Sequence, residues 1–111
     1  NTNFAEGLKT YERNIQNIVN LCLSNNIEVV LCTFCFHLHN KIKNNPSNIL
    51  YEKIIIEENQ IIKKLAKKNN LKLVDCYSLI SKDISNFVDH IHFSPEGMKL
   101  LAKSIAEKIK I

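Results

Sequence analysis

The sequence of 111 residues lacks three features, each of which would point to a particular class of protein. No apolar run approaches the roughly 20 residues that a membrane-spanning helix needs, and no signal-peptide pattern opens the chain. Arg13 is the only arginine, and the densest basic stretch, residues 63–68, places no arginine or aromatic side chain among its lysines. Such a stretch is typical of a solvated helix face, so nucleic-acid binding is not expected.

Cysteine is present, but not in the pattern of a secreted disulfide scaffold. The four cysteines are Cys22, Cys32, Cys35 and Cys76. Cys22 falls on a predicted helical core position and Cys32 inside a predicted strand, where a free cysteine behaves as a small apolar residue. This usage favours a reducing compartment such as the cytoplasm. The length suits one small domain, and an apolar fraction of 45% argues against intrinsic disorder.

The spacing of apolar residues predicts three long helices and two short strands. The helices are expected over residues 4–25, 48–68 and from Ser94 onward, with Ser47 and Ser94 as N-caps. The strands are expected over residues 27–34 and 71–75, with a polar loop over 35–47 and an irregular or one-turn link over 76–84.

The order strand, helix, strand predicts a βαβ unit whose two strands lie parallel. The first strand is almost continuously apolar from Val29 to Cys32, which is typical of a strand covered on both faces. Two strands are too few for a stable sheet of that kind, so further strands are expected N-terminal to Asn1. Residues 1–111 are therefore interpreted as a single domain fragment, the second half of a larger α/β domain.

The segment Phe87–Gly97 carries the candidate chemistry. Asp89 stands three residues before His92, and the segment runs directly into the helix start at Ser94. Asp89 is placed to accept a proton-bearing ring nitrogen of His92, which would leave the other nitrogen free to act as a base. The competing interpretation is a local hydrogen bond within a loop, with no catalytic role.

A second candidate site follows the first strand. Cys32, Cys35, His37 and His39 lie within eight residues and are the ligand types that zinc prefers. Four ligands so close together make a cramped site, and Cys32 is expected to face the core. Core cysteines followed by loop histidines are therefore the competing interpretation.

Residues 87–97, followed by Leu-Leu-Ala-x-x-Ile over 100–105, resemble the last conserved block of the SGNH hydrolases, the GDSL-type esterases and lipases. Residues 11–15 resemble the helix that follows the family's Gly-x-Asn block, and residues 27–34 and 59–75 also fall where the family has its elements. The resemblance implies the C-terminal part of a three-layer α/β/α, flavodoxin-like fold with parallel strands.

By this resemblance, His92 is the general base and acid, Asp89 its orienting carboxylate, and Asn1 a side-chain donor to the oxyanion. The implied reaction is hydrolysis of a small-molecule ester by a Ser-His-Asp triad, without a cofactor. The nucleophile block is missing, because Gly7 and Gly97 are the only glycines and neither stands two residues before a serine. The chain alone is therefore not expected to catalyse, and a non-catalytic, hydrolase-like binding module is the alternative.

Overall fold

The computed structural model of the protein describes residues 2–38 and 44–109. Its helices are α1 (Thr2–Ser24), α2 (Pro46–Lys68), the one-turn α3 (Cys76–Leu79) and α4 (Pro95–Ile109), with a 3₁₀ turn, η1, at Ile84–Asn86. Strands β1 (Val30–Cys32) and β2 (Lys72–Val74) pair in parallel, with Leu31 opposite Leu73. The predicted α/β class and the parallel βαβ unit are confirmed.

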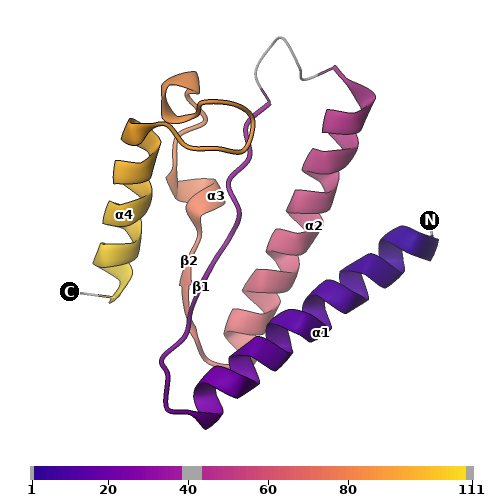
Figure 1. The fold of residues 1–111 in the computed structure, drawn as a ribbon, viewed down its shortest axis with the longest axis vertical. Helices are drawn as coiled ribbons and strands as arrows, with labels where there is room; N and C mark the ends of the chain where they lie inside the picture. The colour runs from indigo at the N-terminus through magenta and orange to yellow at the C-terminus, as the bar shows by residue number, and fades with distance from the viewer. Residues whose placement is uncertain (1, 39–43, 110–111) are drawn as a thin grey trace.

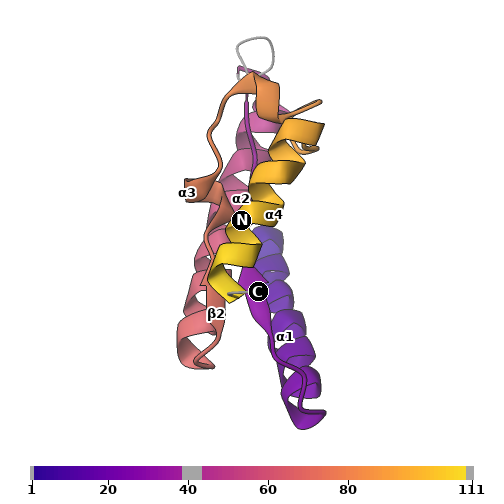
Figure 2. The same cartoon turned by 90° about the vertical axis from the view of Figure 1, so that its left-hand side faces the viewer.

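The elements form three layers, with α2 on one side of the two strands and α4 on the other (Figure 1). On the α4 side, Val74 belongs to a buried apolar cluster against which Leu101 and Ile105 of α4 pack. On the other side, α2 buries an apolar face that includes Ile55 and Leu65. Helix α1 packs against α2 and crosses it obliquely, as Figures 1 and 2 show.

Local sequence signals fix where the helices begin and end. Asn26 and Asn70 adopt the left-handed conformation, with φ of 59° and 54°, and end α1 and α2 as their asparagine pairs predict. Asn45, rather than the predicted Ser47, is the N-cap of α2, because its side chain accepts the N–H of Ser47 and Pro46 takes the first helical position.

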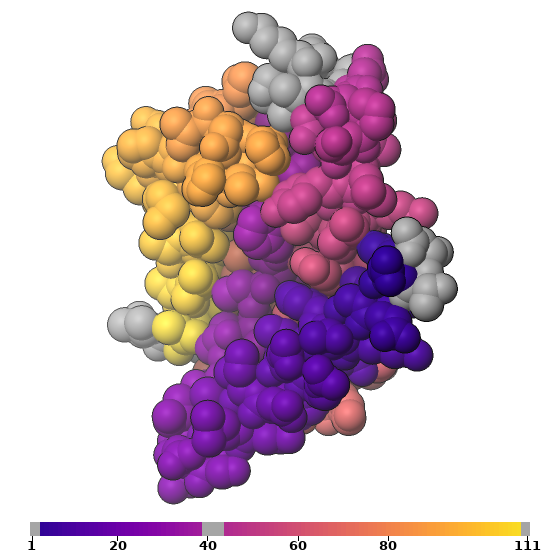
Figure 3. All heavy atoms as spheres, turned by 45° about the vertical axis from the view of Figure 1, so that its right-hand side comes forward, coloured from indigo at the N-terminus to yellow at the C-terminus, as the bar shows by residue number. Residues whose placement is uncertain are grey.

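Strand β1 is less covered than its apolar sequence predicts. Val30 and Leu31 are half-buried and Cys32 is exposed. In the described part of the chain β2 is the only strand beside β1, so the other edge of β1 is open. The molecule measures 45 × 41 × 17 Å, and the segment around β1 reaches the surface between α4 and α1 (Figure 3). The expectation that β1 is covered on both faces is therefore wrong for the chain by itself.

None of the helices in residues 2–38 and 44–109 combines the length and the apolar character needed to cross a membrane. Helix α2 buries an apolar face, whereas α1 fully buries only Val19 among its residues 3–24.

Candidate active site

A short loop between Phe87 and Phe93 carries the Asp/His pair. The two phenylalanines form an isolated antiparallel bridge, and their rings stack with centroids 5.3 Å apart. The N–H of Val88 donates to the carbonyl of His92 at 2.8 Å and closes the loop. Because Phe87 is buried in the core cluster, the base of the loop is fixed while its tip projects into solvent.

Asp89 makes three hydrogen bonds with the residues that follow it. Its Oδ1 accepts the N–H groups of Ile91 and His92 at 2.9 and 2.7 Å, and its Oδ2 lies 2.7 Å from Nδ1 of His92. The backbone N–H of Ile91, followed by the His92 ring and the His92 N–H, holds the pKa of Asp89 well below its usual value. Asp89 is therefore a carboxylate at any ordinary pH.

The carboxylate sets which ring nitrogen of His92 is available for chemistry. A neutral ring that donates Nδ1–H to Asp89 carries its lone pair on Nε2. The side chain of His92 is 69% exposed, so this ring is accessible to another group. The structure thus brings the two predicted residues, Asp89 and His92, within hydrogen-bonding distance of each other.

The start of α4 supports the loop from its C-terminal side. Ser94 caps the helix as predicted, since its Oγ accepts the N–H of Gly97 at 3.2 Å and donates to the carbonyl of Ser85. Gly97 is buried against the carbonyl oxygen of Asn86, and a Cβ atom at Gly97 would overlap that oxygen. Sequence reasoning did not identify this close approach, although the scarcity of glycine in the chain is consistent with a specific use for it.

Asn59 of α2 fixes the chain directly after β1. Its side chain accepts the N–H of Phe34 at 2.7 Å and donates to the carbonyl of Phe34 at 2.9 Å. Three residues further on, the N–H of His37 donates to the carbonyl of His90 at 3.0 Å. The Asp/His loop is thereby joined to the carboxyl end of β1, the edge where open α/β sheets place their ligands.

Asp75, which has no predicted chemistry, links three elements. Its carboxylate accepts the hydroxyls of Thr33 at 2.8 Å and Ser78 at 2.9 Å and lies 3.4 Å from Nζ of Lys63. Burial raises the pKa of Asp75, but the hydrogen bonds from Thr33 and Ser78, together with the nearby Lys63 ammonium, lower it below its usual value. These contacts tie β1, α2 and α3 to the end of β2, which is a structural role.

The structure gives no support to the predicted zinc alternative. Cys35 is buried, and its Sγ lies 3.2 Å from the Lys82 ammonium, a cation where a zinc ligand would need to face the metal. The ring of His37 packs against Phe87. Cys32 was expected to face the core, and this expectation is wrong, because Cys32 is exposed on β1. In the described residues no group of three or more His, Cys, Asp or Glu side chains is arranged to hold a metal ion. His39, the fourth proposed ligand, lies outside these residues.

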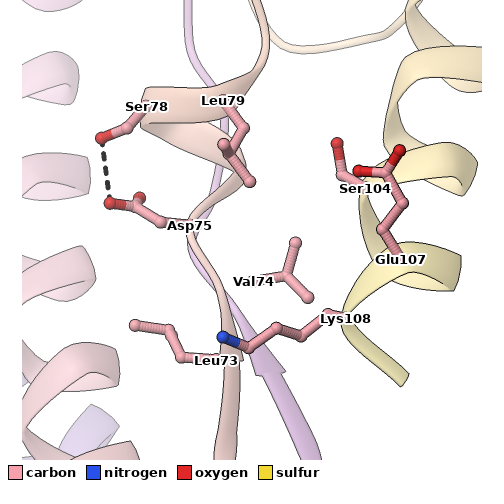
Figure 4. Close-up of a pocket in the computed structure, with 8 residues that line it drawn as sticks. All are labelled: Leu73, Val74, Asp75, Ser78, Leu79, Ser104, Glu107 and Lys108. Atoms are coloured by element: carbon pink, nitrogen blue, oxygen red, sulfur yellow. Dashed lines mark hydrogen bonds between the residues drawn. The ribbon is translucent and has the colours of Figure 1, made fainter. Parts of the chain in front are cut away.

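A cavity of about 490 Å³ opens elsewhere, between β2, α3 and α4 (Figure 4). Two serines line it, but Ser78 donates its hydroxyl to Asp75 and Ser104 donates to the carbonyl of Leu100. No histidine lines this cavity, so neither serine meets an imidazole there. It does not form part of the Asp/His site.

Two components of a triad enzyme are not found beside His92. Among the described residues, Asp89 is the hydrogen-bond partner of the His92 ring, and no serine hydroxyl bonds to it. Asn1, the predicted oxyanion donor, lies outside the described residues. The described chain therefore offers a base and its carboxylate, and the nucleophile must come from elsewhere if the site is to catalyse.

Comparison with known proteins shows which family the chain resembles and how much of a similar protein it covers. The family model described as GDSL-like lipase/acylhydrolase matches residues 1–105. Among solved structures, the chain is similar to a candidate acylhydrolase from Bacteroides fragilis, with 27% identity and a TM-score of 0.65. The match covers 89% of this chain and 50% of the other, so this chain spans about half the length of that protein. No curated protein matches the sequence.

Proposed function

This chain belongs to the GDSL-like lipase/acylhydrolase family, and from that premise we propose that it supplies the acid–base half of a serine ester hydrolase. The observation that carries the proposal is the contact of 2.7 Å between Asp89 Oδ2 and His92 Nδ1, on an exposed loop. The resemblance of residues 87–97 to the last block of the SGNH hydrolases supports Asp89 and His92 as the triad's carboxylate and histidine, and the family match over residues 1–105 supports a hydrolase.

In the proposed reaction, Nε2 of His92 removes the proton of a serine hydroxyl as the serine oxygen attacks the ester carbonyl. Asp89 stabilises the imidazolium without taking the proton, since its pKa is already lowered by the hydrogen bonds it accepts. His92 then returns the proton to the departing alkoxide, and water releases the acyl group by the same sequence. Asn1 remains the candidate side-chain donor to the oxyanion.

We propose further that this chain is the C-terminal half of the catalytic domain, and that the nucleophile belongs to the other half. The open edge of β1 supports this proposal, because an apolar edge strand without a charged side chain is a ready partner for another strand. An apolar hollow of about 330 Å³ lies beside it, lined in part by Phe34, Ile91 and Leu101. Helix α1 exposes Ile18 and Leu21 at 56% and 67%.

The hollow adjoins β1, because Cys32 lines it, and the sequence of this strand suits a buried position. The exposed apolar side chains of the hollow and of α1 are therefore candidates for contact with another segment. A strand–helix unit that bears a Gly-Asp-Ser block would cover them and bring its serine to the carboxyl end of β1. This chain matches only 50% of the similar acylhydrolase, which agrees with a second segment of comparable length that completes the domain.

The test is hydrolysis of p-nitrophenyl acetate by this chain expressed together with the segment encoded directly upstream. His92→Ala is expected to abolish turnover, and Asp89→Asn to lower kcat by roughly 10³- to 10⁴-fold. Val88→Ala, a change at an exposed neighbour, should leave turnover within about twofold and serves as the matched control.

Three outcomes would count against the proposal. Turnover that survives in His92→Ala would remove the histidine from the mechanism. An upstream segment without a serine nucleophile, or a protein that binds esters without turnover, would favour the alternative of a hydrolase-like binding module.

A further inference from the structure

The position of His90, between Asp89 and His92, differs from that of its neighbours. Val88 is 74% exposed, and the side chains of Asp89 and His92 are 48% and 69% exposed. Packing therefore does little to hold these three side chains in place. His90 is half-buried, and its ring turns inward to the body of the protein.

The ring of His90 contacts two aromatic side chains from other elements. It meets the ring of Phe36 edge-on at 5.6 Å and the ring of Tyr51 edge-on at 6.2 Å. Phe36 is 1% exposed and packs against Tyr51 of α2 at 5.3 Å. These are the separations at which aromatic pairs attract each other beyond simple burial.

The backbone of His90 is fixed to the same segment. Its carbonyl accepts the N–H of His37 at 3.0 Å, and His37 packs its own ring on Phe87 at the base of the loop. The segment after β1 is itself held to α2 by the side-chain amide of Asn59. A continuous set of contacts thus runs from α2 through this segment to the tip of the Asp/His loop.

From these contacts we infer that His90 is a positioning residue, which holds the Asp89–His92 pair in the orientation needed for proton transfer. The structural role of His90 does not depend on the proposed function, whereas its effect on catalysis rests on that function. The contacts of the His90 ring are with aromatic rings, so the inference is that its shape and aromatic edge do the positioning. Phenylalanine should therefore replace it, whereas alanine should not.

The experiment compares His90→Ala, His90→Phe and Val88→Ala by NMR of the protein labelled with ¹⁵N in its histidine rings. In the unmodified protein and in Val88→Ala, neutral His92 should be protonated at Nδ1, as its bond to Asp89 requires. His90→Ala should give a mixture of the two tautomers, and exchange of the His92 backbone N–H with solvent should rise at least tenfold. His90→Phe should restore both properties.

If His90→Ala does not fold, His90→Leu takes its place, because leucine fills the space without an aromatic edge. The inference would be overturned if His92 kept the Nδ1 tautomer in whichever aliphatic variant folds, His90→Ala or His90→Leu. It would also be overturned if His90→Phe lost that tautomer. Loss of the Nδ1 tautomer in Val88→Ala would show that any change in the loop has this effect, and would overturn it too.

The catalytic readout separates this inference from the proposed function. In the chain expressed with its upstream segment, His90→Ala should lower kcat for p-nitrophenyl acetate by about ten- to a hundredfold with little change in KM, since misplacement of a catalytic group impairs the chemical step. If the protein hydrolyses no ester while the tautomer still depends on His90, the proposed function fails and the positioning role stands.

Discussion

Replacing Gly97 by alanine is expected to destabilise the protein, even though alanine is the better helix former. A methyl group at Gly97 would overlap the carbonyl oxygen of Asn86 and stand 2.8 Å from Cδ1 of Phe93. The carbonyl is a backbone group that also accepts the N–H of Ser94, so it cannot rotate away as the end of a flexible side chain would. Neither glycine has a positive φ, and Gly97 is therefore required for space rather than for conformation.

The magnitude follows from these contacts. Overpacking of this kind costs about 1–3 kcal/mol, and the gain in helix propensity offsets at most about 1 kcal/mol of it. To relieve the overlap, the first turn of α4 would have to move away from η1. Because η1 leads directly into the Asp/His loop, this movement would also shift the base of the loop. We therefore expect both lower stability and a weaker Asp89–His92 contact.

Gly7 provides a matched control, because nothing lies within 4 Å of a Cβ atom built there. Gly7→Ala, within α1, should stabilise the protein by about 0.5–1 kcal/mol. Urea unfolding followed by far-ultraviolet circular dichroism measures both variants; for a domain of this size 1 kcal/mol corresponds to a shift in Tm of about 4–8 °C. A Gly97→Ala protein as stable as the unmodified one would refute the reasoning.

Three further predictions concern the polar contacts. Asn59→Ala should destabilise the protein by about 1–3 kcal/mol in urea unfolding, because it leaves the N–H and carbonyl of Phe34 without their partner; a loss below about 0.5 kcal/mol would contradict this. Thr33→Val should lower stability by a similar amount, since the Thr33 hydroxyl donates to Asp75, and a neutral result would show that this bond has no net value. The pKa of Asp89 is lower in the folded protein than in the unfolded chain. Its ionised carboxylate therefore stabilises the protein at pH above the unfolded-state pKa, and this stabilisation is lost as the pH falls through the folded-state pKa. In ¹³C NMR the Asp89 carboxyl should titrate below the usual range, and an ordinary midpoint would contradict the hydrogen bonds described.

Much of the fold could be predicted from the sequence, because local signals govern it. The asparagine pairs that end α1 and α2, the start of α4 at Ser94, and the parallel strands joined by a helix are all encoded in short segments. The N-cap of α2 shows the limit of such signals, since Asn45 and Ser47 are both good caps and only the backbone path selects between them.

The features that sequence reasoning missed depend on contacts between distant segments. The approach of Gly97 to Asn86, the double hydrogen bond of Asn59 to Phe34 and the seat of His90 each join residues that no local pattern connects. The prediction that β1 is covered on both faces was wrong for a related reason, because the apolar character of a strand shows that it needs neighbours but not which polypeptide segment supplies them.

The most direct test of the central claim is labelling of the active serine with a fluorophosphonate probe. The chain expressed with its upstream segment should be labelled on one upstream serine, as peptide mass spectrometry would show, because only a serine activated by a base reacts readily. His92→Ala should abolish the labelling and Val88→Ala should leave it intact. Equal labelling of the unmodified protein and His92→Ala would contradict the assignment of the Asp89–His92 pair as the catalytic acid–base couple.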